Sequence, residues 1–90
     1  MANHKSAEKR NRQAQIRRVR NKINRKRMKT SIRSFEEAME TGSVDSAKDA
    51  LREATIVIAR TARKGTIHKK NASRKISRLA KRVNAMEGAA

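Results

Sequence analysis

The sequence predicts an all-α protein, namely a three-helix bundle with an extended, highly basic N-terminal helix. Three observations predict this fold class. The 90 residues contain no proline and only three glycines, which suits long helices. Apolar residues recur at spacings of three and four along most of the chain. Two of the glycines, Gly42 and Gly65, each follow a helical pattern and precede a Ser or Thr, as at the end of one helix and the start of the next.

These residues divide the chain into helices at roughly 6–41, 44–63 and 67–86. Gly42 and Gly65 are predicted to be the C′ residues, and Ser43 and Thr66 the N-caps that follow them. Asp45 then falls in the first turn of the second helix, where the helix dipole favours a carboxylate. A chain of this length is expected to form a single domain.

The first helix carries two apolar stripes that cannot share one partner. Met28, Ile32, Phe35 and Met39 form one stripe, and residues 16, 19 and 23 form another, rotated from it by roughly 140°. We therefore expect residues 1–27 to be a basic arm continuous with the first helix, and residues 28–88 to form the bundle. We expect the arm to be frayed in the free protein and to become helical when phosphates neutralise it.

The second and third helices each carry one full apolar stripe. The stripes are Ala47, Leu51, Ala54, Ile58 and Ala62, and Ala72, Ile76, Leu79, Val83 and Met86. The predicted core combines Ile32, Phe35, Met39, Leu51, Ala54, Ile58, Ile76, Leu79, Val83 and Met86. Opposite the third stripe lie Lys70, Arg74, Lys75, Arg78, Lys81 and Arg82, so one face packs on the protein and the other suits a polyanion.

Charge indicates the class of partner. The formal net charge is +17, and a small body with this charge repels itself unless it lies beside a polyanion, nucleic acid above all. Residues 1–33 hold 13 Lys or Arg and one acid, and residues 63–90 hold 9 and one. Residues 34–62 hold six acids and three bases. We therefore expect the first and last blocks to contact the partner and the middle block to face elsewhere.

Several residue types are missing. Without cysteine there is no disulfide or thiolate metal site, and Phe35 is the only aromatic residue. Because the core uses Phe35, we expect recognition of folded, helical nucleic acid through its backbone rather than of splayed bases. The sequence has no signal peptide or membrane span, so a cytoplasmic location is expected.

Catalysis is not expected. His4 and His68 have no carboxylate neighbour in sequence, so we predict neither an enzyme nor a cofactor. Asp45, Asp49 and Glu53 share one helical row, which would suit a metal ion or a solvated acidic face, and we favour the solvated face.

Three other classes of protein are alternatives for such a basic helical chain. An architectural double-stranded nucleic-acid-binding protein of histone-like type is the main alternative, although it would usually show wedge residues. A basic zipper would need leucine heptads beyond Gly42, where the helix ends. A cationic membrane helix would need a broad apolar face with aromatic anchors.

One segment resembles a known family. Residues 64–79, KGTIHKKNASRKISRL, resemble the signature K-G-x-I-H-K-x-x-A-x-R-x-x-S-R-L of the S-twenty family of bacterial small-subunit ribosomal proteins. The start, MANHKSAEKR, and the segment KTSIRSFEEAM are also similar to that family. Three positions depart from its usual pattern, namely His4, Glu8 and Lys26.

The resemblance implies a structural constituent of the small ribosomal subunit that binds 16S rRNA directly and stabilises its fold during early assembly. The implied partners are the 5′ domain and the long penultimate helix of 16S rRNA, with no membrane and no homo-oligomer. The contacts it implies are Lys5, Ser6, Lys9, Arg10, Arg17, Lys64, His68, Lys69, Asn71, Arg74 and Arg78. Charge and position add Arg12, Arg18, Asn21, Arg25, Lys29, Lys70, Lys75 and Lys81 as rRNA-binding candidates. From the residues alone, His68 could equally be a plain surface histidine.

Overall fold

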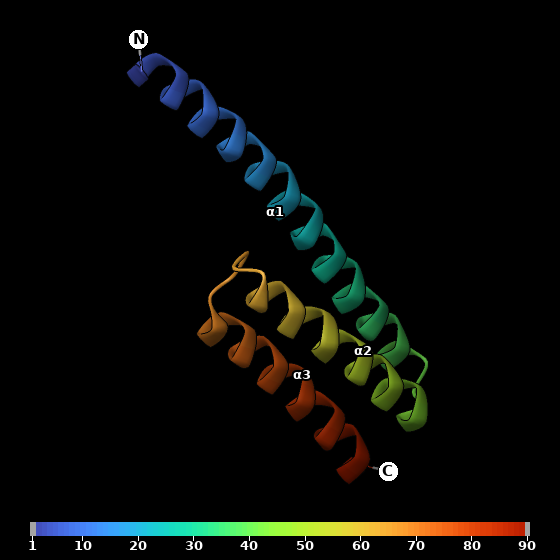
Figure 1. Cartoon of the computed structure of the whole chain (residues 1–90). Helices are drawn as coiled ribbons and strands as arrows, with labels where there is room; N and C mark the ends of the chain where they lie inside the picture. The colour runs from blue at the N-terminus through green and yellow to red at the C-terminus, as the bar shows by residue number, and fades with distance from the viewer. Residues whose placement is uncertain (1, 90) are drawn as a thin grey trace.

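The computed structural model consists of three α-helices and describes the backbone of residues 2–89 and the side chains of residues 4–89. The helices are α1 (Ala2–Glu40), α2 (Val44–Arg63) and α3 (Lys69–Ala89). In Figure 1, α2 lies between α1 and α3, and the N-terminal half of α1 extends past both. The predicted all-α fold with a long first helix is therefore confirmed. No helix in the described residues is long and apolar enough to cross a membrane.

Both helix ends that glycine was predicted to form are present. Gly42 and Gly65 have φ values of 76° and 80°, in the left-handed region that only glycine adopts at little cost. At the end of α2, the Gly65 N–H donates to the carbonyl of Ala62 (2.9 Å) and the Thr66 N–H donates to that of Thr61 (3.2 Å). These two bonds form a Schellman motif, which turns the chain sharply toward α3.

The two predicted N-caps differ in outcome. The Ser43 hydroxyl accepts a hydrogen bond from the Ser46 N–H (3.3 Å), as predicted. The prediction for Thr66 is wrong, because α3 begins only at Lys69. His68 precedes this helix, and its Nδ1 accepts a hydrogen bond from the Lys70 N–H (3.1 Å). The hydroxyl of Thr66 is unavailable for capping because it binds α1 instead.

The core lies along α2 and follows the predicted stripes. Phe35 and Ile58 are the largest side chains that are fully buried. The rest of the buried apolar set is Met28, Ala47, Ala54, Ala72, Leu79 and Val83. The other residues of the predicted core are half-buried around it, namely Ile32, Met39, Leu51, Ile76 and Met86. A core built on alanines lets α2 approach both neighbours closely.

Arg82 corrects one detail of the predicted cationic face. Its guanidinium lies over the Phe35 ring, 5.4 Å from the centroid, and 3.6 Å from Glu36 Oε1. It therefore covers the core between α1 and α3 instead of joining the cations of α3. At the same end of the molecule, Glu87 pairs with Lys48 and raises the pKa of that ammonium group.

Candidate nucleic-acid interface

The free end of α1 is the first basic surface. All side chains of residues 4–20 are exposed. Ile16 and Val19 are 62% and 59% exposed, so these two residues of the second apolar stripe have no packing partner among residues 4–89. This segment carries the predicted contacts Lys5, Ser6, Lys9, Arg10, Arg12, Arg17 and Arg18. Contrary to the sequence expectation, His4 does have a carboxylate neighbour, since its Nε2 lies 3.2 Å from Glu8 one turn later.

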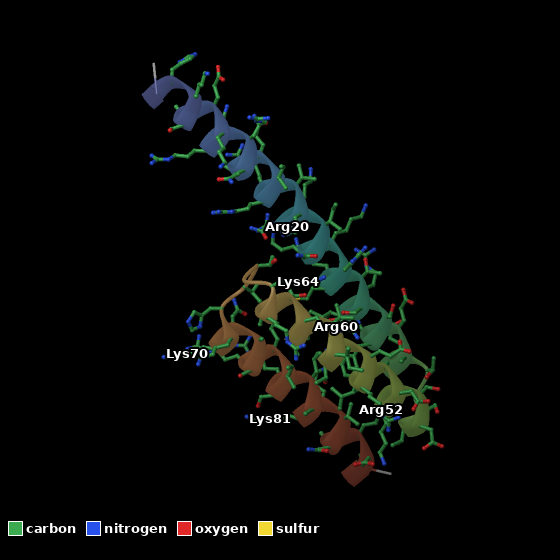
Figure 2. All side chains as sticks on the ribbon, viewed as in Figure 1. Arg20, Arg52, Arg60, Lys64, Lys70 and Lys81 are labelled. Carbon is green, nitrogen blue, oxygen red and sulfur yellow. The ribbon has the colours of Figure 1, made fainter. Side chains whose placement is uncertain are left out.

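The outer edge of α3 is the second basic surface. Figure 2 places Lys70 and Lys81 along the side of α3 that is farthest from α1. The exposed predicted contacts on this helix are Lys69, Lys70, Asn71, Arg74, Arg78 and Lys81, and Lys75 is half-buried. The buried residues Ala72, Leu79 and Val83 face α2. The third helix therefore does divide into a packing face and a cationic face.

A short hydrogen-bonded chain joins the two surfaces. The Thr66 hydroxyl donates to Asn21 Oδ1 (3.1 Å) and accepts from Asn24 Nδ2 (3.1 Å). Asn24 is only 5% exposed, so this contact is part of the packing between α1 and the α2–α3 loop. It ties the α2–α3 loop to α1 at Thr66, between Lys64 and His68, both of which are exposed. The signature segment is thereby placed next to the N-terminal block.

Sequence reasoning missed the basic end of α2. Arg60 and Arg63 stand in the last turn of this helix and are both exposed. Figure 2 places Arg60 and Lys64 on the side of α2 nearer α1. The predicted contacts Arg25 and Lys29 are exposed on α1. The signal was present in the last turn, but the charge blocks divided it, because Arg60 falls in the acidic block 34–62 and Arg63 in the basic block 63–90.

The acidic row lies apart from these surfaces. Asp45, Asp49 and Glu53 are exposed on the first half of α2, at the opposite end from Arg60. Within residues 4–89, no three potential ligands gather in a way that could hold a metal ion.

Carboxylates leave the predicted interface cations free. Among the side chains that the structure describes, the ion pairs are His4–Glu8, Lys48–Glu87 and Arg82–Glu36. Apart from Arg82, which covers the core, none of these involves a Lys or Arg of the predicted cationic surfaces. The molecule therefore presents two cationic surfaces whose countercharge must come from outside.

These features define a class: a small, basic, all-helical protein that exposes two cationic surfaces. Its family is established by comparison with known proteins. The chain belongs to the family described as Ribosomal protein S20, whose model matches residues 2–84. The resemblance found in the sequence is thereby confirmed, and so are the non-enzymatic class and the association with the ribosome.

Similar proteins cover nearly the whole chain. A protein of Desulfotalea psychrophila is 62% identical over 89 residues, which are 99% of this chain and 100% of the relative. One of Syntrophobacter fumaroxidans is 55% identical over 86 residues, covering 96% and 100%. One of Magnetococcus marinus is 49% identical over 90 residues, covering 100% and 98%. All three are named "Small ribosomal subunit protein bS20".

Proposed function

We propose that this protein is a structural constituent of the small ribosomal subunit that binds 16S rRNA directly and stabilises its fold during assembly. The observation that carries the proposal is the pair of exposed cationic surfaces, namely residues 4–20 of α1 and the outer edge of α3. The cations of these surfaces have no carboxylate partners among the described side chains. Membership of the family supports the small subunit as the site of action.

The geometry favours bridging two RNA segments. The exposed part of α1, residues 4–20, is about 25 Å long and leaves the packed helices, while the α3 edge faces away from α1. One RNA element can therefore surround the arm while another lies against α3. The 5′ domain and the long penultimate helix are the two elements that the family resemblance implies. We assign their contacts to the nineteen candidate residues named from the sequence.

Binding should depend strongly on salt. If about ten phosphates are neutralised, the logarithm of the association constant should fall with log[salt] at a slope of very roughly −7 to −9. Filter binding of the full-length protein to a 16S rRNA transcript, at salt concentrations from roughly 50 to 400 mM, would measure this slope. A slope shallower than about −3 would contradict a role based on phosphate contacts.

Two further measurements make the test specific. At equal salt, the protein should bind the rRNA transcript more tightly than duplex DNA of equal length, whereas a histone-like protein would bind both alike. Chemical footprinting on naked 16S rRNA should protect two separate regions, one lost when the arm is deleted and the other lost when the α3 cations are neutralised. A single protected region that both changes abolish would argue against bridging.

A further inference from the structure

A groove between α1 and α2 lies at the basic end of α2, apart from the free end of α1 and the outer edge of α3. It has a volume of about 670 Å³ and opens to solvent beside the α2–α3 loop. Ile23 and Val57 supply apolar surface, and Ile23 is 48% exposed there. Four cations line it, Lys26, Arg27, Arg60 and Lys64, with no acidic residue. Grooves that bind small organic groups have volumes in this range and combine apolar walls with a few polar side chains.

Three hydroxyls of the groove donate to carbonyls of their own helices. Thr30 Oγ1 donates to the carbonyl of Lys26 (2.9 Å), Ser31 Oγ to that of Met28 (2.8 Å), and Thr61 Oγ1 to that of Val57 (2.7 Å). A carbonyl oxygen can only accept, so each hydroxyl has already used its hydrogen. Thr61 is only 3% exposed, so in this arrangement the oxygens of Thr30 and Ser31 are the two that can accept a hydrogen bond from a bound group.

We infer that this groove receives one unstacked nucleotide of the bound RNA, with its base against Ile23 and Val57 and its phosphates beside the four cations. The inference rests on the proposed rRNA binding and adds a site to it. A regular duplex presents sugars and phosphates on its outside and offers nothing for the apolar surface. An unpaired nucleotide offers a flat apolar face, a polar edge and an anionic linkage, which match the three kinds of side chain in the groove.

The acceptor hydroxyls further restrict the base. Adenine, cytosine and guanine each carry an exocyclic amino group that can donate to such oxygens. Uracil has no amino group, and its single N–H lies between two carbonyls, so a hydroxyl oxygen that accepts from this N–H also faces a carbonyl oxygen. The nucleotide in the groove should therefore carry an amino group. The chain lacks aromatic stacking platforms, and an aliphatic groove between two helices replaces them at this one place.

Two isoleucines provide a matched pair of variants. Ile23 lines the groove and is 48% exposed, while Ile56 lies on α2 outside the groove and is 45% exposed. The full-length variants Ile23→Ser and Ile56→Ser lose the same groups and no charge. With a 16S rRNA transcript, Ile23→Ser should bind about tenfold more weakly, equal to ~1.4 kcal/mol, and Ile56→Ser should bind like the wild type. The salt slope should be the same for all three proteins.

Base-specific probing supplies a second readout. The wild type and Ile56→Ser should protect one unpaired A, C or G that becomes reactive with Ile23→Ser. Thr30→Trp, which places an indole in the groove at an exposed position, should cause the same loss, with circular dichroism showing that the variant is folded. Because the chain has no cysteine, Thr30→Cys also gives a unique site for a short photo-crosslinker in assembled subunits.

The outcomes separate this inference from the proposed function. Equal binding by both isoleucine variants, protection of a uracil, or a crosslink from position 30 to a protein would overturn the nucleotide site while leaving rRNA binding intact. A wild-type protein that fails to bind the transcript would overturn the proposed function, and the groove site with it.

Discussion

Thr66 is the residue through which the two basic parts of the chain meet. Its hydroxyl is hydrogen-bonded to Asn21 and Asn24, which are 45 and 42 residues away in sequence. Buried polar groups in native proteins are almost always hydrogen-bonded, and Asn24 obtains its partner from the loop. The contact ties the loop between Lys64 and His68 to α1 at the point where the exposed arm begins.

Replacing Thr66 with valine should lower the free energy of unfolding by about 1–2 kcal/mol, because Asn24 would keep a buried amide without its partner. The control is Thr55→Val, a half-buried threonine whose hydroxyl bonds only the Leu51 carbonyl of its own helix (2.7 Å). Its loss should cost less than about 0.5 kcal/mol. Urea denaturation followed by circular dichroism measures both. Equal effects in the two variants would mean that the contact between loop and α1 contributes nothing.

The sequence predicted residue roles well where they depend on near neighbours. Ser43 caps α2 and Gly65 ends it because the groups they satisfy lie within a few residues. Thr66 was misassigned for the opposite reason, since a Thr after a helix-ending Gly looks like a cap unless its distant partners are known. The contact between Arg82 and Phe35 could likewise not be predicted from the sequence, because those residues meet only when α1 and α3 are packed in the folded protein.

At the scale of helices, α1 is one continuous helix with two segments that differ in packing. From Asn24 onward its buried residues, Asn24, Met28 and Phe35, face the rest of the protein. Residues 4–20 make no such packing and are all exposed. The change of stripe phase, visible in the sequence, accounts for this division, because a straight helix cannot turn both stripes toward α2. The boundary proposed near residue 28 stays a prediction about folding units.

Removing residues 1–20 should leave folding intact and abolish tight RNA binding. The truncation keeps Asn21 and all buried residues, so the free energy of unfolding should change by less than about 1 kcal/mol. The affinity for 16S rRNA should fall by several orders of magnitude, because seven cations are lost. Denaturation and filter binding test the two parts separately. A matched full-length variant, with those seven cations changed to Gln, should bind as weakly, which distinguishes charge from length.

Over the whole molecule, charge is separated along the long axis. The described structure measures 69 × 21 × 12 Å. The acidic end, where α1 ends, α2 begins and α3 ends, carries Glu36, Glu37, Glu40, Asp45, Asp49 and Glu87. The other end carries the arm, the last turn of α2 and the first turns of α3. Such a molecule would be oriented by the field of a polyanion before contact, with its basic end leading.

This polarity was only partly readable in the sequence. The block averages correctly separated basic ends from an acidic middle, and the stripes gave three helices and their packing faces. The averages concealed that α2 itself changes sign along its length, from Asp45 and Asp49 to Arg60 and Arg63. The groove between α1 and α2 could not be predicted at all, because Ile23 and Val57 are brought together only by the packing of the two helices.

Two triple variants should respond differently to salt if only the basic surfaces contact RNA. Lys70→Gln/Arg74→Gln/Lys81→Gln removes three charges from the α3 edge, and Asp45→Asn/Asp49→Asn/Glu53→Gln removes three from the acidic row. The first should reduce the magnitude of the salt slope by about 2–3, since each lost phosphate contact removes roughly 0.7–0.9. The second should leave the slope unchanged and raise the affinity slightly at low salt, because only long-range repulsion is relieved. Filter binding to 16S rRNA over a salt series measures both. If neutralising the acidic row changed the slope or weakened binding, α2 would contact the RNA with its acidic face, and the separation of charge would have to be reinterpreted.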